Sequence, residues 1–438
     1  MKVLMLTPYL PFPPSSGGQI RSYNLIKHLS RKHEITLYSL IKTDEERKFI
    51  PELKKYCHNV HVFKRSKSPW TLRNILLTGF GPYPFLVIRN LSPKERSALK
   101  DEILKNKYDL IHAETFYVMP HIPDTKVPIL LVEQTIEYLV YLHYVESIKN
   151  IFVRLLLSID VAKLKFWETM FWKKADGVVA VSGTDKKEML RLAPKLEVGL
   201  VPNGVNLEFF RIKKSWDDKS PKILFVANFK WLQNVEAAEL LLDEVFPIIL
   251  KKNPSAKVWI VGQYVPEEIR ARKGERVLID NLKEDDEEGI RKAYYEASVF
   301  VSPLKGPGGT RLKHFAAMAA KLPLVTTKVG AEGLGVVDDE HILVRDNPEA
   351  LAEAAVEILT DPIKAKSLAF GIVSLAIALS LFVSIYQLST TQKPIILPFQ
   401  TGFQTAFASI SQDTSRIAQG FFLGSGFGTY ATDFTRFK

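Results

Sequence analysis

Residues 299–313, VFVSPLKGPGGTRLK, decide the fold that we expect for this chain. The stretch begins with apolar residues typical of a buried strand, and Gly308 and Gly309 then lead into a segment with helical spacing. Such a loop lets backbone N–H groups and the positive end of the helix dipole meet an anion. Arg311 and Lys313 add two cations on the first helical turn. The stretch therefore predicts a parallel α/β sheet with a phosphate-binding loop at a strand end.

Short apolar runs alternate with helical patterns on both sides of this stretch, which is typical of parallel sheets covered by helices. The alternation forms two series, in residues 1–206 and 222–362, with a polar and densely charged linker expected at residues 207–221. We therefore expect two doubly wound, Rossmann-like α/β domains that face each other across a cleft. The strands are expected at residues 2–10, 34–41, 60–64, 109–114, 128–133, 177–182, 222–229, 257–262, 276–279, 299–303, 323–327 and 341–344.

Helices are expected between these strands. Residues 136–175 have apolar residues at helical spacing and many aromatic side chains. We interpret them as one or two long helices that pack on the first domain, and direct contact with a membrane is the alternative. In the second series, helices are expected at residues 234–252, 284–296, 310–320 and 348–359.

The composition is that of an ordinary globular protein, with 46% hydrophobic and 24% charged residues among 438. At about 150 residues per domain, this length allows roughly three units. The single cysteine, Cys57, excludes an intramolecular disulfide and a metal site built from several cysteines. A reducing cytoplasm is the simplest compartment for such a chain.

The chain carries 59 Lys and Arg against 48 Asp and Glu, a net charge of +11, and the excess falls in residues 1–200. A basic face attracts nucleic acid, acidic lipids or phosphorylated substrates. No helix-turn-helix, zinc-finger or ribonucleoprotein motif accompanies the charge, so we expect no nucleic-acid partner.

Residues 367–388, SLAFGIVSLAIALSLFVSIYQL, contain no charged residue. At 1.5 Å per residue they form a helix of about 33 Å, which is long enough for a hydrocarbon core of about 30 Å. We predict a transmembrane helix here, with a buried core helix as the alternative. Lys364 and Lys366 precede it and Lys393 follows it, a weak positive-inside signal that places the soluble domains on the cytoplasmic face of the cytoplasmic membrane. The N-terminus shows no signal-peptide pattern and is expected to form a strand.

A second glycine loop lies in residues 11–21, PFPPSSGGQIR, after the first expected strand. Gly17 and Gly18 let the backbone approach a ligand closely, and a helix begins there. The loop has the form of a phosphate or sugar site, although a pair of glycines is more often a simple turn.

GGTRLK followed by AMAAKLPLVTTKVGAEGL resembles the donor-site segment of retaining glycosyltransferases of the GT-B fold, family 4. The resemblance covers most of residues 1–362. It extends to YLPFPPSSGGQIRSYNLIKHL, GVVAVSGTDKKEML, VPNGVNLEFF, FVANFKWLQNVEAAELL and VWIVGQ, in the family's order. It implies transfer of a sugar from a UDP- or GDP-sugar to a polysaccharide or lipid-linked acceptor, with retained configuration and without a metal or other cofactor. The chain also has no Asp-x-Asp motif to hold a metal.

The resemblance assigns site residues by position. Arg311 and Lys313 would bind the donor diphosphate, and Glu114 would lie next to the transferred sugar; these three are the expected catalytic residues. For Glu114 a structural role is equally open, and His112 is expected as a core histidine. The expected donor-binding residues also include Gly308, Gly309, Thr310, Ala316, Asn228 and Glu332. On the acceptor side and in the cleft we expect Gly17, Gly18, Arg21, Glu133, Asn203 and Gly204.

The chain departs from the family pattern at Ala316, where a glutamate would accept hydrogen bonds from the ribose hydroxyls. Losing that acceptor weakens donor binding by about 1.5–3 kcal/mol. Ala227 and Lys321 also replace glycines that are common in the family. The alternative to an active enzyme is therefore a catalytically impaired relative that binds a nucleotide-sugar or a partner in glycan assembly.

The C-terminal part departs as well. Relatives end in a helix that returns to the N-terminal domain, whereas this chain continues into the apolar span at residues 367–388. The tail of residues 389–438 has no predicted structure and is similar to a fragment of an O-antigen ligase or polymerase-type membrane protein, so a gene fusion is a further alternative. A nucleotide-sugar epimerase on the same fold is a third possibility, but it needs no basic acceptor surface.

Overall fold

The computed structural model describes residues 1–210, 219–306, 308, 310–361 and 363–368. Residues Met1–Lys366 form one compact unit. The predicted membrane helix at residues 367–388, apart from its first two residues, and the tail at 389–438 lie outside the described part. Among the described residues, no helix combines the length and the apolar character that crossing a bilayer requires.

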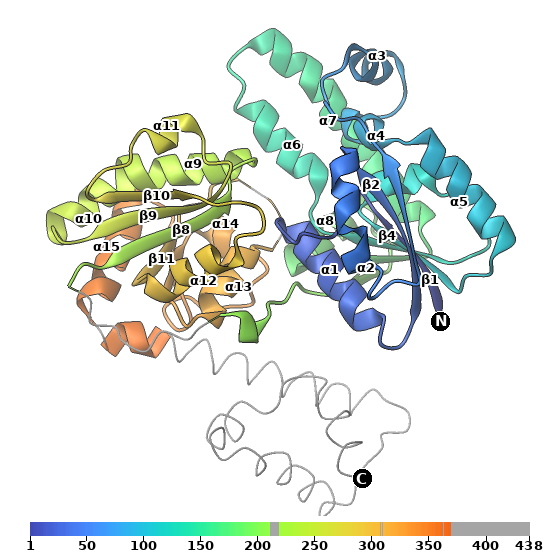
Figure 1. The fold of residues 1–438 in the computed structure, drawn as a ribbon. Coiled ribbons are helices and arrows are strands. Elements are labelled where there is room, and N and C mark those ends of the chain that lie inside the picture. The colour runs from blue at the N-terminus through green and yellow to red at the C-terminus, as the bar shows by residue number, and fades with distance from the viewer. Residues whose placement is uncertain (211–218, 307, 309, 362, 369–438) are drawn as a thin grey trace, which may run out of the picture. The chain divides into compact units, whose positions relative to one another are not determined.

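The N-terminal domain is built on a seven-stranded parallel sheet with the strand order β3-β2-β1-β4-β5-β6-β7 (Figure 1). Strands β1 and β2 are buried at every position but the first, because helices cover both faces of the sheet. Strand β7 was not predicted, since three residues with two exposed give no apolar run. The strands are β1 (Lys2–Thr7), β2 (Glu34–Ile41), β3 (Asn59–Lys64), β4 (Leu110–Glu114), β5 (Ile129–Glu133), β6 (Gly177–Ala180) and β7 (Val198–Leu200).

The helical segment predicted at residues 136–175 forms two helices, α6 and α7. The Glu168 carboxylate accepts hydrogen bonds from the first two N–H groups of α6, at 2.8 and 3.1 Å. The Asn150 side chain caps the start of α7 in the same way. The helices of this domain are α1 (Gly17–Leu29), η1 (Asp44–Phe49), α2 (Ile50–Leu53), α3 (Leu72–Phe80), α4 (Phe85–Asn90), α5 (Pro93–Lys105), η2 (Phe116–His121), α6 (Glu137–Glu146), α7 (Ile151–Lys174) and α8 (Gly183–Leu192).

The C-terminal domain is built on a six-stranded parallel sheet with the order β10-β9-β8-β11-β12-β13. Its strands are β8 (Lys222–Asn228), β9 (Lys257–Gln263), β10 (Val277–Asn281), β11 (Val299–Ser302), β12 (Leu324–Thr326) and β13 (Leu343–Val344). A short 3-10 turn, η3 (Leu207–Phe209), precedes this domain. The helices of the domain are α9 (Leu232–Leu240), η4 (Leu241–Val245), α10 (Phe246–Lys252), α11 (Glu267–Arg270), α12 (Glu287–Glu296), α13 (Leu312–Ala319), α14 (Lys328–Ala331) and α15 (Pro348–Thr360).

The helix predicted at residues 234–252 is interrupted by a π turn, η4. Pro247, the second residue of α10, has no N–H group to donate within the helix, so the chain widens before it. The rest of the second series lies where the sequence predicted it, to within a few residues.

Each sheet reverses its strand order once, between β1 and β4 and between β8 and β11. The connections leave to opposite faces at such a point and open a crevice at the carboxyl ends of the strands. The loop after β1 leads to Gly17 and Gly18, the first two residues of α1, and the loop after β11 contains Gly308. The prediction of two parallel-sheet α/β domains is therefore confirmed, and both glycine loops stand at these crevices.

Candidate active site

The loop after β11 encloses the side chain of Arg311. Nη2 of Arg311 donates to the carbonyl oxygen of Gly306 at 2.6 Å, and Nη1 donates to that of Gly308 at 3.1 Å. Burial lowers the pKa of Arg311 to about 10, while the charges of Glu332 and Asp185 act in the opposite direction. The guanidinium remains charged at neutral pH, so the loop presents a desolvated cation. Gly309 lies outside the described residues.

Lys313 lies one residue inside α13 and is held by neutral groups. Its Nζ donates to Oδ1 of Asn234 at 2.6 Å and lies 4.6 Å from the ring centroid of Phe225. Asn234 in turn donates to the backbone oxygen of Asn228 at 2.7 Å. Burial, and then the charge of Arg311, lower the pKa of Lys313 well below its ordinary value. The predicted donor residues Asn228 and Lys313 are thus joined by Asn234, which the sequence analysis did not single out.

Two carboxylates act electrostatically on Arg311. Asp185 is buried in the first turn of α8, where its carboxylate accepts from Oγ of Ser182 at 2.6 Å. Burial raises the pKa of Asp185 to about 6, the Ser182 hydrogen bond lowers it, and the charge of Glu332 raises it. Partial burial likewise raises the pKa of Glu332, and Arg311 lowers it. The predicted donor residue Glu332 therefore lies within electrostatic reach of Arg311.

Helix α13 carries Ala316, which is buried, so this position provides no ribose acceptor. His314 is fully buried on the same helix; its Nδ1 lies 2.9 Å from the carbonyl oxygen of Gly330, and its Nε2 has no partner among the described residues. Burial and the charges of Lys313 and Arg311 lower the pKa of His314 well below its ordinary value. His314 is therefore neutral at physiological pH.

Gly18 is required by a side-chain pair in the N-terminal domain. Oη of Tyr9 donates to Oε1 of Gln134 at 2.9 Å. A Cβ atom on Gly18 would overlap both of these oxygen atoms. The backbone of α1 can approach the pair only because residue 18 has no side chain.

Glu114 ends β4 and is fully buried in a polar network. Its Oε1 lies 2.8 Å from Nε2 of His112, and its Oε2 accepts from Gln134. Burial by itself would raise the pKa of Glu114, but the hydrogen bond to His112 and the attraction of His112 and Arg21 hold it below its ordinary value. Glu114 is thus ionised at neutral pH, and Nε2 of His112 carries the proton because a carboxylate only accepts.

The same network agrees with the expectation that His112 is a core histidine with a hydrogen-bond partner. It is buried, and the partner of its ring is the candidate catalytic carboxylate of Glu114. Residues two apart in a strand share one face, and this spacing is the signal that could have paired His112 with Glu114. Tyr9 and Gln134 were also missed.

Arg21 links α1 to the segment after β7. Its Nη1 donates to Oδ1 of Asn203 at 2.8 Å and to the carbonyl oxygen of Pro202 at 3.4 Å. A Cβ atom on Gly204 would meet no described atom within 4 Å. The predicted cleft residues Arg21, Asn203 and Gly204 therefore lie together, and a hydrogen bond joins Arg21 to Asn203.

Glu133, predicted to face the cleft, is instead fully buried at the end of β5, against Trp172 of α7. Its Oε1 accepts from Nε1 of Trp172 at 2.9 Å, and its Oε2 has no partner among the described residues. Burial and the nearby charge of Glu168 raise the pKa of Glu133 well above its ordinary value. Strand alternation explains this placement, because neighbouring residues point to opposite faces and Gln134 takes the side of Glu114.

The two glycine loops meet at the starts of their helices. A Cβ atom on Gly17 would lie 3.4 Å from Cδ1 of Leu312, so the first turn of α1 touches that of α13. Oγ1 of Thr310 donates to the carbonyl oxygen of Val181 at 3.2 Å, just before α8. The positive ends of helices from both domains are thus brought together around the donor loop.

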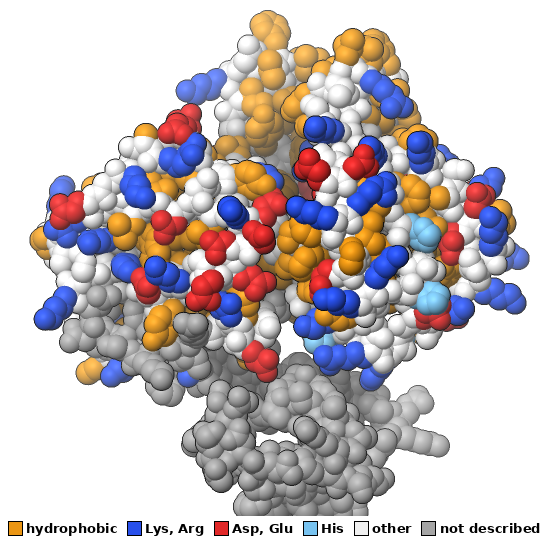
Figure 2. All heavy atoms as spheres, viewed as in Figure 1, with side chains coloured by type: hydrophobic (Ala, Val, Ile, Leu, Met, Phe, Trp, Pro, Cys, Tyr) orange, Lys and Arg blue, Asp and Glu red, His pale blue; other side chains and the backbone are white. Residues whose placement is uncertain are grey.

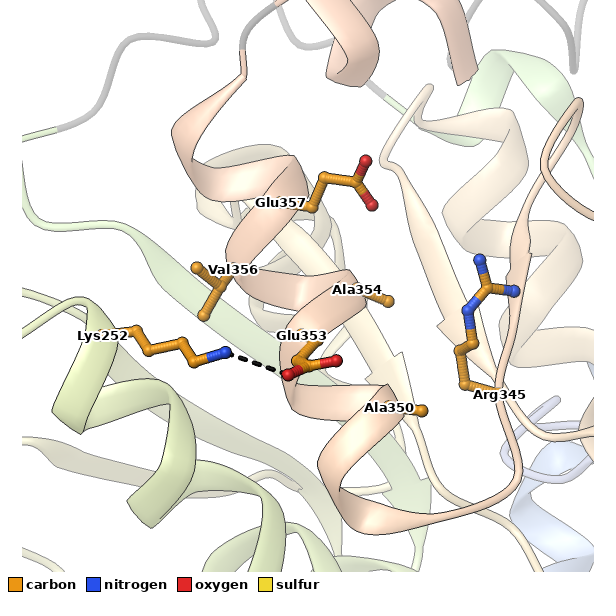
Figure 3. Close-up of a pocket in the computed structure, with 7 residues that line it drawn as sticks. All are labelled: Lys252, Arg345, Ala350, Glu353, Ala354, Val356 and Glu357. Carbon is orange, nitrogen blue, oxygen red and sulfur yellow. Dashed lines mark hydrogen bonds and ion pairs between the residues drawn. The ribbon is translucent and has the colours of Figure 1, made fainter.

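A shallow pocket lies elsewhere on the C-terminal domain, along α15 (Figure 3). An ion pair of 3.1 Å between Lys252 and Glu353 crosses its edge. None of the predicted donor or acceptor residues lines it, and we assign it no role in catalysis. The lining residues are Lys252, Arg345, Ala350, Glu353, Ala354, Val356 and Glu357.

Both domains match models of known families. Residues 220–361 match the model described as glycosyl transferases group 1, and residues 15–209 match the model described as glycosyltransferase family 4. The protein is a glycosyltransferase of the GT-B fold. The resemblance drawn from the sequence is confirmed to this extent.

Three similar proteins share between 14% and 22% of their residues with this glycosyltransferase. It is 22% identical over 382 residues to an uncharacterized 44.6 kDa protein in the cps region of Klebsiella pneumoniae, a match that covers 84% of this chain and 94% of that protein. Its structure is similar to sucrose-phosphate synthase from Thermosynechococcus elongatus, with 19% identity, a TM-score of 0.60, and coverage of 89% and 99% of the two chains. Anabaena HepE in complex with UDP has 14% identity, a TM-score of 0.54, and coverage of 88% and 100%. At these identities the structural likeness shows the fold alone.

Proposed function

We propose that this glycosyltransferase moves a sugar from a UDP- or GDP-sugar to a glycan or lipid-linked acceptor, with retention and without a metal ion or other cofactor. The observation that carries the proposal is the placement of Arg311 and Lys313 at the start of α13, beside the glycine loop. The Arg311 cation and the positive end of a helix stabilise a diphosphate leaving group, and the negative charge of a bound diphosphate favours the protonated, cationic form of Lys313. The similar structure of Anabaena HepE was solved with UDP and with UDP-glucose, which supports a uridine nucleotide as donor.

The proposed reaction needs little from side chains. The bond between the sugar and the diphosphate oxygen breaks, the acceptor oxygen forms the new bond on the same face, and the departing oxygen takes the acceptor proton. Arg311 and Lys313 stabilise the negative charge that develops on the diphosphate. Glu114 is an ionised carboxylate at the β1/β4 crevice, where it can stabilise positive charge on the sugar ring.

We further propose that the protein works on the cytoplasmic face of the cytoplasmic membrane. An apolar surface lies over α3 and the start of α7 (Figure 2), and Lys163 joins the two elements through the carbonyl oxygens of Thr78 and Gly81, at 2.6 and 2.9 Å. Phe80 is 91% exposed and Phe152 is 77% exposed. The surface consists of Trp70, Leu72, Ile75, Leu76, Leu77, Phe80, Ile151, Phe152, Val153, Leu155, Leu156 and Ile159.

An anionic bilayer is the occupant that fits this surface. Monomeric proteins rarely leave so many large apolar side chains exposed together. Lys67, Arg73, Lys149 and Arg154 flank the surface in the sequence and would meet acidic headgroups. The membrane contact that the sequence analysis kept as an alternative for residues 136–175 is thus our proposal, beside the predicted span at 367–388. Hydrogen exchange of the full chain should show protection of α3 and the start of α7 in phosphatidylglycerol vesicles compared with phosphatidylcholine vesicles; equal exchange would contradict this contact.

Ala316 favours a second candidate, a catalytically impaired relative that binds the donor without turning it over. The position is buried and apolar, and the family glutamate is absent. A gene fusion involving residues 367–438 belongs to the same alternative.

The deciding experiment measures nucleoside diphosphate release from UDP-, GDP- and ADP-sugars. The detergent-solubilised full chain and its Ala316→Glu variant are assayed side by side, and an extract of lipid-linked acceptors supplies the acceptor. Ala316→Gln is the matched control. Turnover by the unmodified chain supports the transferase, and turnover only after Ala316→Glu supports the impaired relative. Absence of nucleoside diphosphate release by both proteins contradicts the transferase proposal. Product NMR tests retention, and an unchanged rate in chelator is expected if no metal takes part.

A further inference from the structure

Three cations gather at the carboxyl edge of the N-terminal sheet, outside the site described above. Lys42 follows β2 and Arg65 follows β3, and these strands are neighbours in which Ile41 pairs with Lys64. The N–H of Arg65 also donates to the carbonyl oxygen of Ile41 at 2.9 Å, which fixes the two cations side by side.

Arg89 completes the cluster from α4. Arg65 donates through Nη1 to the side chain of Asn90, the residue next to Arg89, and Asn90 is itself buried and bonded to Leu86. The charge of Arg89 acts on both Arg65 and Lys42. Lys42, Arg65 and Arg89, which we call the cation cluster, are therefore placed by two strands and one helix.

No ion pair neutralises the cluster within the part of the chain that the structure describes. Arg65 has a neutral partner in Asn90, and its Nε is buried with no partner among the described residues. Within the same part of the chain, no hydrogen bond or ion pair is made by the side chain of Arg89 or of Lys42. Three carboxylates interact electrostatically with the cluster without forming an ion pair: Glu46 with Lys42 and Arg65, Glu284 with Lys42, and Glu137 with Arg89. One oxygen of Glu46 accepts from the backbone N–H groups of Lys42 and Thr43, at 2.7 and 3.0 Å.

Like charges held together with part of their hydration removed raise the free energy of the unliganded protein. An anion between them would relieve this repulsion. Arginine is suited to the task because its planar fork matches the oxygen pairs of phosphate and carboxylate groups.

The cation cluster adjoins the reacting centre. Tyr9 lies within electrostatic reach of Arg65, and it is hydrogen-bonded to Gln134 and through it to Glu114. Lys230 of the C-terminal domain acts electrostatically on Lys42, so the cluster lies on the side of the N-terminal domain that is close to the C-terminal domain.

We infer that Lys42, Arg65 and Arg89 form a subsite for a phosphate or carboxylate group of the acceptor. This inference rests on the proposed transferase function and specifies its substrate, an acceptor with a negative charge close to the hydroxyl that is glycosylated. Two sources share this chemistry, the diphosphate of a lipid-linked acceptor and the carboxylate of an acidic glycan.

The test is calorimetric binding of inorganic pyrophosphate and of D-glucuronate to the full chain in detergent, with UDP in excess to occupy the donor loop. We expect one or both anions to bind. Arg65→Gln combined with Arg89→Gln should weaken binding about 10- to 100-fold, which corresponds to the loss of one charged hydrogen bond. The matched control, Arg31→Gln at an exposed arginine, should change neither affinity.

Arg65 also donates a hydrogen bond to Asn90, so the double variant can be less stable than the wild type. Arg89→Gln alone leaves this hydrogen bond intact and is therefore the second variant. It should raise the acceptor KM at least fivefold and leave the rate of UDP-sugar hydrolysis by water unchanged. Pyrophosphate binding alone points to a lipid-linked diphosphate, and glucuronate binding points to an acidic glycan. No binding of either anion, or binding that the variants leave unchanged, overturns the subsite. Absence of UDP-sugar hydrolysis in the wild type would instead contradict the proposed function, while binding would still report on the subsite.

Discussion

Replacing Arg311 by alanine tests the donor loop directly. Arg311 holds the carbonyl oxygens of Gly306 and Gly308 at 2.6 and 3.1 Å, so the change removes a cation and two loop hydrogen bonds together. A hydrogen bond from a charged donor contributes about 1.5–3 kcal/mol to the loop. Removing one preorganised donor from developing negative charge costs about 2.7–4 kcal/mol, or 10²–10³ in rate. We expect kcat/KM to fall by about 10²–10³ in Arg311→Ala, and further when Lys313→Ala is added.

The assay is steady-state release of nucleoside diphosphate, with thermal unfolding measured in parallel. Arg311→Lys keeps the charge but loses the planar fork, so its rate should lie between those of the wild type and of Arg311→Ala. Lys305→Ala is the matched control, because Lys305 is an exposed cation on the same loop. A double variant of Arg311 and Lys313 that folds and turns over at the wild-type rate would refute the donor site.

Three further changes test the N-terminal domain. Gly18→Ala places a Cβ atom against Tyr9 and Gln134, so the free energy of unfolding should fall by about 1–3 kcal/mol with loss of transfer; full stability by urea denaturation would contradict the packing. Glu114→Gln removes the buried negative charge and should lower kcat at least tenfold, about 1.4 kcal/mol, with little change in donor KM, and an unchanged kcat would remove Glu114 from the mechanism. Burial raises the pKa of Glu95 from 4.5 to about 8. The protonated Glu95 therefore contributes fully to the free energy of unfolding below pH 4.5, and this contribution, on the order of 3–5 kcal/mol, is lost as the pH rises to about 8. Glu95→Gln should therefore raise the unfolding midpoint more at pH 8 than at pH 5, and equal shifts would show that Glu95 titrates normally.

Local signals made most of the fold predictable. Apolar runs bounded by polar turns mark strands wherever helices cover both faces of a sheet, as at β1 and β2. The same signal fails for β7, which is short and partly exposed. It also cannot show the π turn at η4, because the apolar spacing continues through it and only Pro247 breaks the backbone pattern.

The site was only partly predictable, for a different reason. Arg311 and Lys313 stand in one contiguous motif, but the bond from Tyr9 to Gln134 joins residues 125 positions apart. Such pairs depend on strand order, which no local pattern contains. Glu133 and Gln134 are neighbours in the sequence but have different environments. Because alternate residues of a strand point to opposite faces, Glu133 lies in the core and Gln134 at the crevice.

The parallel sheet nevertheless supplies a rule that uses these distant residues. Every strand of such a sheet ends at the same edge, so polar residues at or just after each strand end are candidates for one site. Applied to the observed strands, the rule selects Tyr9 after β1, Lys42 after β2, Arg65 after β3, Glu114 at the end of β4 and Gln134 after β5. This set contains most of the Glu114 network and of the cation cluster.

The effect of Ala316 on catalysis follows from where the ribose lies relative to the reaction. A ribose contact is made equally in the ground state and in the transition state, because no bond to the ribose changes when the sugar leaves the diphosphate. Such uniform binding lowers KM without raising kcat. Arg311 and Lys313 instead meet charge that develops only as the bond breaks, so the rate depends on them. Ala316→Glu should then lower the donor KM about 10- to 100-fold, the equivalent of one charged hydrogen bond, and leave kcat unchanged. A rise in kcat at saturating donor would mean that the missing glutamate acts on the chemical step, and the impaired relative would be the better description of this chain.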